Sequence, residues 1–190
     1  MSGLPKNVRG RPRSSEARQA ILSAFTHAVR TQGYSKTSID QLSKQSGVSR
    51  STIYRWYPDK VDIALDAAAD TAKSARNAPL TGDMDADLER HFKYTFEAAN
   101  TLGQLFTAMM AEAQSQPEFS ERVWKEFSSL RREYLSRILL QNDQSNRDIE
   151  LIMDMIFGAV WYRMMSGHAP LDANFSGALI EKIKVLLEHD

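Results

Sequence analysis

The sequence contains no cysteine among its 190 residues, and this absence excludes disulfides, thiolate metal sites and a cysteine nucleophile. It also lacks any run approaching the ~20 consecutive apolar residues that a membrane-spanning helix needs, and its first residues lack the apolar core of a signal peptide. We therefore expect a cytoplasmic protein with no membrane partner.

The motifs of common enzyme sites are missing as well. There is no glycine-rich phosphate loop, no nucleophile elbow and no paired-carboxylate motif. The four histidines, at positions 27, 91, 168 and 189, do not make the ligand spacing of a metal site. The sequence therefore predicts a protein that is not an enzyme and that uses no cofactor and no metal.

The chain lacks a net charge, because 24 basic residues balance 24 acidic ones. The two parts of the chain differ, however. Residues 1–60 hold 11 Lys/Arg and 3 Asp/Glu (11 − 3 = +8), and residues 61–190 hold 13 and 21 (13 − 21 = −8). Such a basic block beside an acidic body indicates either an end that binds a polyanion or a basic solvated tail, and composition leaves both open.

Nearly every segment repeats its apolar residues at helical spacing, and none sustains the two-residue alternation of a strand. The first helix is expected to begin at Ser14 or Ser15 and to end at Gly33. Further helices are expected at about 38–47, 49–57, 59–78, 84–100, 102–115, 117–141, 146–166 and 173–188. The sequence thus predicts an all-α fold of about nine helices, organised as a basic arm (1–13), a three-helix N-terminal domain (14–60) and a C-terminal helical domain (61–190).

The segment "SIDQLSKQSGVSRSTIYRWYPDK", residues 38–60, carries the strongest functional signal. Two short helices flank a Gly-Val-Ser turn, which is the helix-turn-helix arrangement whose second helix lies in the DNA major groove. Ile53 and Tyr57 are four residues apart and can face the same core as Leu42. The outer side of the second helix is then left with five residues: Arg50, Ser51, Thr52, Tyr54 and Arg55.

These outer residues have the chemistry of DNA contacts. Arginine can read guanine through a bidentate hydrogen bond. Hydroxyl groups, the ammonium of Lys60 and the free amides at helix starts can hold phosphates.

The segment "TSIDQLSKQSGVSRSTIYRWYPDKVDIAL", Thr37 to Leu65, resembles the DNA-binding signature of the TetR/AcrR transcriptional regulators. The stretches "LFTAMMAEAQSQPEFSERVWKEF" and "DMIFGAVWYRMMSGHAPLD" are similar to the regulatory domain of one branch of that family. The resemblance implies base or near-base contacts for Arg50, Ser51 and Tyr54. It implies phosphate contacts for Ser38, Thr52, Trp56 and Lys60. Core packing of Tyr54 and a wedge between helices for Trp56 remain alternatives.

The N-terminal arm places Arg9, Arg11 and Arg13 around Gly10 and Pro12, which prevent a helix there. The tetrapeptide "RGRP" resembles the core of an AT-hook, which lays arginines into a narrow A·T-rich minor groove. The alternative is a tail that adds only a general attraction to phosphate.

For the C-terminal domain, the resemblance implies a ligand cavity, although most large apolar residues there must form plain core. Aromatic and methionine side chains suit an adaptable apolar pocket. The candidates for its lining are Phe92, Phe96, Phe106, Met109, Met110, Phe127 and Tyr134. His91 and Glu112 are candidate polar anchors. Few charges accompany these residues, so we expect a small hydrophobic or amphipathic ligand.

The last two helices carry wide apolar stripes. In TetR-like proteins the equivalent pair forms a four-helix bundle across a twofold axis, so the resemblance implies a homodimer. Packing within one protomer is the alternative. The candidate interface residues are Ile149, Met153, Ile156, Phe157, Val160, Trp161, Met164, Phe175, Leu179 and Ile183.

The sequence as a whole predicts a homodimeric, ligand-responsive transcriptional regulator. We expect a repressor that binds a palindromic operator on double-stranded DNA and is released by a small hydrophobic effector. Two other interpretations stay open: an architectural or constitutive DNA-binding protein without an effector, and a helical interaction module whose helix-turn-helix is only a scaffold.

Overall fold

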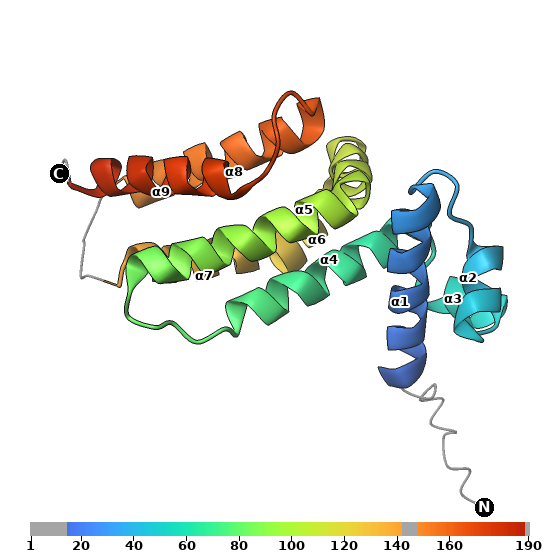
Figure 1. The fold of residues 1–190 in the computed structure, drawn as a ribbon. Helices are drawn as coiled ribbons and strands as arrows, with labels where there is room; N and C mark the ends of the chain where they lie inside the picture. The colour runs from blue at the N-terminus through green and yellow to red at the C-terminus, as the bar shows by residue number, and fades with distance from the viewer. Residues whose placement is uncertain (1–14, 142–147, 189–190) are drawn as a thin grey trace, which may run out of the picture. The chain divides into compact units, whose positions relative to one another are not determined.

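The computed structural model describes residues 15–141 and 148–188, and within these ranges it contains nine α-helices and one π-helical segment (Figure 1). The all-α prediction is confirmed. The chain divides into two compact units, residues 1–60 and 61–190. The helices are α1 (Ser15–Gln32), α2 (Ile39–Ser46), α3 (Arg50–Trp56), α4 (Lys60–Arg76), α5 (Met84–Ser115), α6 (Pro117–Val123), α7 (Ser129–Leu139), α8 (Ile149–Ser166) and α9 (Ala173–Glu188), with the π-helix η1 (Trp124–Ser128) between α6 and α7.

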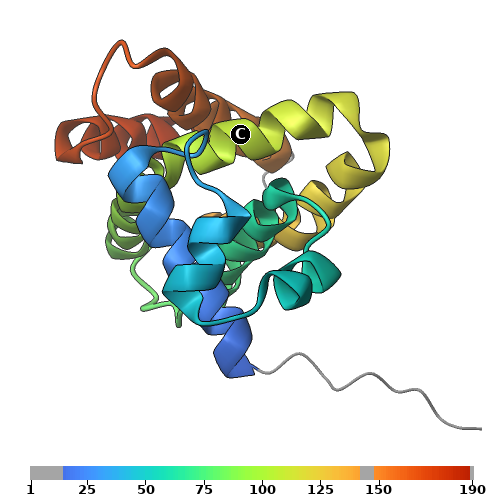
Figure 2. The ribbon, with the colours of Figure 1, turned by 90° about the vertical axis from the view of Figure 1, so that its right-hand side faces the viewer.

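In the first unit, α1 packs on α2 and α2 packs on α3 (Figure 2). The apolar stripe of α1 is buried through Ile21, Leu22, Phe25 and Val29. The turn between α1 and α2 is closed by Thr37, whose hydroxyl donates to the carbonyl of Gly33 at 3.0 Å. This small core fixes the position of α2 and α3 on α1.

In the second unit, α5 is the central helix and packs against α6, α7, α8 and α9. The expected break between residues 100 and 102 is wrong, because α5 continues without interruption for 32 residues. Gly103 sits inside this helix, and a Cβ added there would lie 3.4 Å from Cγ of Met164 in α8. Gly103 thus allows α5 and α8 to approach closely, and it does not end a helix.

The segment expected as a single helix over 117–141 contains a change of helical type. It begins with Pro117 in its first turn, as expected, but residues 124–128 form a π-helical turn before α7 resumes. A π-turn inserts an extra residue into the helical repeat and shifts the faces on either side. Residues 146 and 147, the expected start of the next helix, lie outside the described residues, and α8 begins at Ile149.

A buried carboxylate ties one end of this unit together. Asp87 of α5 is fully buried and accepts hydrogen bonds from the Thr81 amide (3.0 Å), the Gln141 side chain (2.8 Å) and Arg90 (2.6 Å). Desolvation alone would raise the pKa of Asp87, but the hydrogen bonds and the charge of Arg90 outweigh it and lower the pKa. The Asp87 cluster, meaning Asp87, Arg90, Thr81 and Gln141, therefore joins the loop before α5 to the end of α7.

Candidate nucleic-acid interface and cavity

The two helices of the helix-turn-helix begin at well-formed caps. The Ser38 hydroxyl accepts from the Gln41 amide and the Ser49 hydroxyl accepts from the Thr52 amide, each at 3.3 Å. Gly47 ends α2 in the left-handed conformation, with φ of 69°, which a residue with a Cβ rarely adopts. The first residue of α3, Arg50, therefore follows three residues after the glycine that ends α2.

The inner face of this motif is buried as expected. Leu42 and Ile53 are fully buried, and Tyr57 is nearly so. The outer face presents Arg50, Ser51, Tyr54 and Arg55 to solvent. Tyr54 is 50% exposed, which excludes the core-packing alternative for this side chain.

The remaining candidates on α3 are less exposed. Thr52 and Trp56 are half-buried. The hydroxyl of Ser49 lies 3.1 Å from that of Ser51 and 2.9 Å from that of Thr52, so three hydroxyls gather at the start of α3. Hydroxyls and free amides at a helix N-terminus are suited to hold a phosphate.

Arg50 has a partner that the sequence did not reveal. Its Nε lies 2.9 Å from Oδ1 of Asp40 in the first turn of α2, and both side chains are exposed. An exposed ion pair of this kind contributes little to stability. The guanidinium is therefore held beside α2 but remains available to exchange Asp40 for a base edge or a phosphate.

Lys60 was predicted to contact phosphate, and the structure gives it another task. Its ammonium donates to the carbonyls of Tyr34 (2.9 Å) and Thr37 (3.2 Å) and lies 4.2 Å from the Tyr34 ring centre. Burial lowers the pKa of Lys60, and the nearby Asp59 partly offsets this effect. Two of its three N–H groups thus hold the turn before α2 in place, and the phosphate contact of Lys60 stays a prediction. The arm residues Arg9, Arg11 and Arg13 lie outside the described residues.

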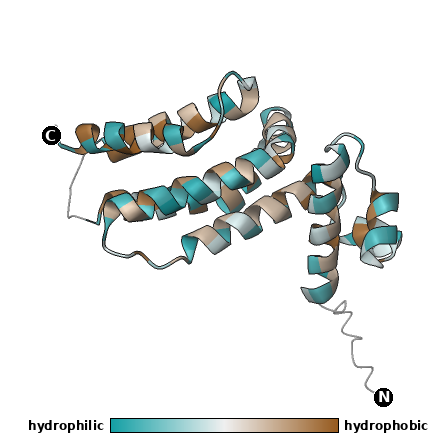
Figure 3. Ribbon diagram, in the orientation of Figure 1, coloured by the Kyte–Doolittle hydropathy of each residue, from teal (hydrophilic) through white to brown (hydrophobic). Residues whose placement is uncertain are grey.

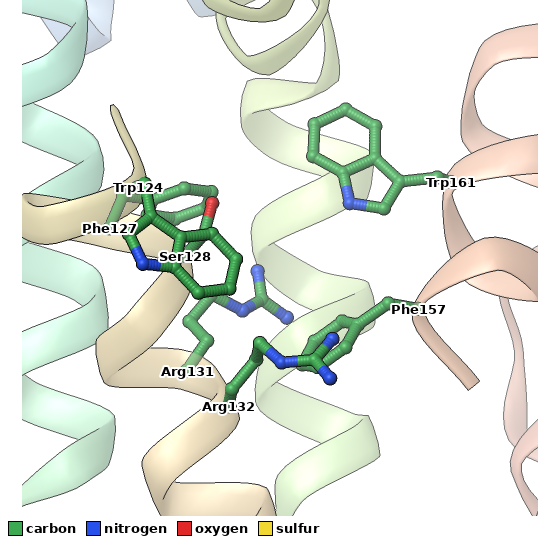
Figure 4. A pocket seen from close by; sticks show the side chains of 7 residues that line it. All are labelled: Trp124, Phe127, Ser128, Arg131, Arg132, Phe157 and Trp161. Carbon is green, nitrogen blue, oxygen red and sulfur yellow. The ribbon is translucent and has the colours of Figure 1, made fainter. Parts of the chain in front are cut away.

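The second unit contains a cavity of about 150 Å³ between α7 and α8 (Figure 4). Phe157 and Trp161 from α8 face residues of η1 and α7 across it. The lining residues are Trp124, Phe127, Ser128, Arg131, Arg132, Phe157 and Trp161. The π-turn matters here, because it contributes three of these seven residues.

The predicted pocket lining coincides with this cavity at one residue, and Phe96 lines a second cavity between α5 and α9. Of the seven candidates only Phe127 lines this cavity. Phe92, Phe96 and Tyr134 belong to the packed core between α5, α7 and the last two helices. Met109 is fully buried, Met110 is half-buried, and neither lines the cavity. Phe106 stacks on Phe127 with ring centres 5.4 Å apart and so supports the wall from behind.

The two suggested polar anchors, His91 and Glu112, are also absent from the lining. Burial, together with the charge of Arg131, lowers the pKa of His91 to about 3, so its imidazole is neutral at neutral pH. The charged groups that do line the cavity are two consecutive arginines of α7. Sequence reasoning missed them because arginines are common on helix surfaces, and helical spacing does not show which of them lines a cavity.

Most of the predicted dimer residues pack within the protomer, on the inner side of the last two helices, and their place at a dimer interface stays a prediction. Met153, Ile156, Val160 and Ile183 are buried in the core of the protomer itself. Ile149, Met164, Phe175 and Leu179 pack against that core, while Phe157 does so and also lines the cavity with Trp161. Hydrophobic residues recur along both helices in Figure 3, so the pattern alone did not show which side faces inward.

A different stripe of α8 is exposed. Leu151 and Met155 are 58% and 52% exposed, and Tyr162 and Met165 are more so. Gly158 lies between them, and a Cβ added there would meet no atom within 4 Å. We call this surface (Leu151, Met155, Gly158, Tyr162 and Met165) the outer α8 face. Its spacing of four, three, four and three residues places it along one side of the helix.

Metal sites and membrane spans are not found in residues 15–141 and 148–188. No group of three or more histidine and acidic side chains in these ranges is arranged to hold a metal ion. None of the helices there combines the length and the apolar character that crossing a membrane requires.

Comparisons with known proteins agree with this geometry. A family model described as "Tetracyclin repressor-like, C-terminal domain" matches residues 78–183, and one described as "Bacterial regulatory proteins, tetR family" matches residues 21–67. The HTH-type transcriptional regulator YdeS of Bacillus subtilis, itself uncharacterized, is 27% identical over 166 residues, which are 84% of each chain.

Solved structures share the fold. The crystal structure of the TetR family transcription regulator SCO0332 superposes with a TM-score of 0.73 at 25% identity, covering 92% of this chain and 98% of the other. A regulator from Saccharomonospora viridis, solved in complex with choline, has a TM-score of 0.64 at 15% identity, covering 93% and 98%.

Proposed function

Because the chain belongs to the TetR family of bacterial regulatory proteins, we propose that it is a homodimeric repressor that leaves its operator when a small molecule binds. The chain is a transcriptional regulator with a helix-turn-helix. The observation that carries it is the outer side of α3, where Arg50 and Tyr54 are exposed on a helix whose own core is closed behind them.

In this proposal α3 enters the major groove. Arg50 releases Asp40 and donates to a guanine, while the hydroxyls of Ser51 and Thr52 lie near the backbone phosphates. Trp56 and the serine cap at position 38 contact neighbouring phosphates. The arm, with Arg9, Arg11 and Arg13, follows the adjacent minor groove.

Two copies associate through the outer α8 face. A twofold dimer uses the same surface on both protomers, and an operator with inverted half-sites mirrors that symmetry. The exposure of Leu151 and Met155 supports this choice of surface, because large apolar side chains gathered on one helix face mark interaction sites.

The response to a ligand is assigned to the cavity beside α7. A solved regulator of this fold holds choline, which supports a ligand site in the fold but does not identify the ligand here. For release, the ligand must bind the DNA-incompetent form better than the DNA-bound form. A coupling of about 1–3 kcal/mol would lower DNA affinity roughly 5- to 150-fold.

The test of the DNA-binding surface is the Arg50→Ala variant. We expect it to lose about 1–3 kcal/mol of affinity for the operator and much less for random DNA, because a bidentate arginine–guanine contact carries sequence information. Fluorescence anisotropy at one fixed salt concentration measures both affinities.

Arg30→Ala is the matched control, since Arg30 is an exposed arginine in the last turn of α1, outside the helix-turn-helix. It should leave the ratio of the two affinities unchanged. Equal losses on operator and random DNA for Arg50→Ala would instead make Arg50 a phosphate contact.

A further inference from the structure

The cavity beside α7 contains two arginines in different electrostatic situations. Arg132 is paired with two carboxylates, at 2.6 Å from Oδ1 of Asp154 and in contact with the carboxylate of Glu150. Arg131 has no carboxylate within 4 Å among the residues that the structure describes. Its one hydrogen-bond partner in that part of the chain is the hydroxyl of Thr95, at 3.1 Å.

Arg131 is surrounded by rings. Its guanidinium carbon lies 5.4 Å from the centre of the Phe127 ring and 5.6 Å from that of Phe157. The nearby His91 is neutral and supplies no negative charge. Burial lowers the pKa of Arg131 to about 10, so the guanidinium remains protonated at neutral pH. A cation is therefore held in a mostly apolar site without a counter-charge.

Such an arrangement is costly unless something compensates it. Arg131 is half-buried, and removing a charge even partly from water without a partner disfavours the folded state, which stacking on aromatic faces offsets only in part. Glu150 and Asp154 do not neutralise Arg131, because both are solvent-exposed and are paired with Arg132. An anion bound in the cavity would supply the missing charge.

The walls limit what that anion can be. The rings of Trp124, Phe127, Phe157 and Trp161 line about 150 Å³, and the Ser128 hydroxyl is the one neutral polar side chain among the lining residues. A cavity of this size accommodates a benzene-sized body. A planar carboxylate matches the fork of a guanidinium.

We propose that this cavity binds a small organic acid whose carboxylate pairs with Arg131 and whose single ring or short branched chain lies among the aromatic walls. This inference rests on the proposed ligand response and names the chemical class of its ligand. The proposed ligand differs from the small hydrophobic effector expected from the sequence, since its carboxylate is needed for binding. A quaternary ammonium, which aromatic walls can also hold, would be repelled by Arg131.

The test uses three probes of similar size: benzoate, benzyl alcohol and benzyltrimethylammonium. Titration calorimetry on the full-length protein without DNA should find benzoate the tightest of the three. Arg131→Gln should weaken benzoate about tenfold or more, since a hydrogen bond to a charged group contributes about 1.5–3 kcal/mol. The affinity for benzyl alcohol should change little.

Arg132→Gln is the matched control, because it removes the neighbouring arginine of the same cavity but one whose charge is already neutralised. It should keep the affinity for benzoate within a few-fold, and circular dichroism checks that both variants remain helical. Tighter binding of the ammonium probe, no binding of benzoate, or equal benzoate affinity in wild type and Arg131→Gln would overturn the proposal.

A separate measurement of operator affinity distinguishes this proposal from the proposed function. Benzoate binding without any loss of operator affinity would keep the acid site and refute the ligand response. Specific operator binding without benzoate binding would refute the acid site and leave the DNA-binding function intact.

Discussion

Replacement of Met155 by aspartate is expected to convert the proposed dimer into monomers. Met155 is half-exposed in the protomer and lies near the middle of the outer α8 face, so the substitution disturbs little of the protomer's own core. In the dimer it would place an unpaired carboxylate in a desolvated interface, at a cost of about 3–5 kcal/mol. Sedimentation velocity should show the dimerisation constant weakened by about a hundredfold or more.

The matched control for this variant is Tyr94→Asp, since Tyr94 is a similarly exposed large side chain on α5, outside the proposed interface. It should sediment as the wild type does. A Met155→Asp protein that remains dimeric at micromolar concentration would show that the outer α8 face is not the interface. A loss of operator binding that follows dissociation is also expected, because each monomer reaches only one half-site.

Removal of the Asp87 carboxylate is expected to be the most destabilising single change in the second unit. Asp87→Ala leaves the Thr81 amide and the Gln141 and Arg90 side chains without their shared acceptor in a buried site. Breaking such a buried pair costs about 3–5 kcal/mol of the free energy of unfolding. Urea denaturation at pH 7, with the protomer concentration held fixed, measures the loss.

The effect should depend on pH in a defined direction. The folded-state pKa of Asp87 is lowered, so the stability it contributes is fully present above its unfolded pKa of about 3.9. That contribution is lost as the pH falls from there through the folded pKa. The difference between wild type and Asp87→Ala should therefore shrink below about pH 4.

Asp85→Ala provides the comparison. Asp85 lies two positions before Asp87 in the first turn of α5. Its carboxylate, however, is exposed and pairs with the ammonium of Lys184 at 2.8 Å. Such a pair is worth about 0–1 kcal/mol. If the two substitutions cost the same at pH 7, the Asp87 cluster would not have the structural role assigned to it.

The helix-turn-helix could be predicted from the sequence because its determinants are local. Ser38, Gly47 and Ser49 act within a few residues of themselves as caps and a turn, and the structure has them in these roles. The burial of Ile53 and Tyr57 follows from their four-residue spacing. The hydrogen bonds of Lys60 could not be predicted, for the opposite reason, since its partners Tyr34 and Thr37 are more than twenty residues away in the sequence.

The differences between prediction and structure in the second unit have a common physical cause. The spacing of apolar residues shows which face of a helix is apolar, but not which element packs on that face. A break was expected between residues 100 and 102, but α5 continues there, and Gly103 is where it approaches Met164 of α8. Helix α8 is apolar on most sides, so the pattern gave no reason to prefer Ile156 as inward and Met155 as outward. The position of Arg131 in the cavity depends on a π-turn, and no residue type in η1 marks such a turn.

We propose that a dimer presenting α3 from each protomer binds one palindromic operator. Footprinting on DNA from around the protein's own gene is the decisive experiment, combined with anisotropy on the protected fragment and on a scrambled one. We expect one protected segment with two inverted half-sites about one helical turn apart, and binding at least about a thousandfold tighter than to the scrambled fragment at the same salt concentration. Equal affinity for both fragments, with no protected segment, would contradict it.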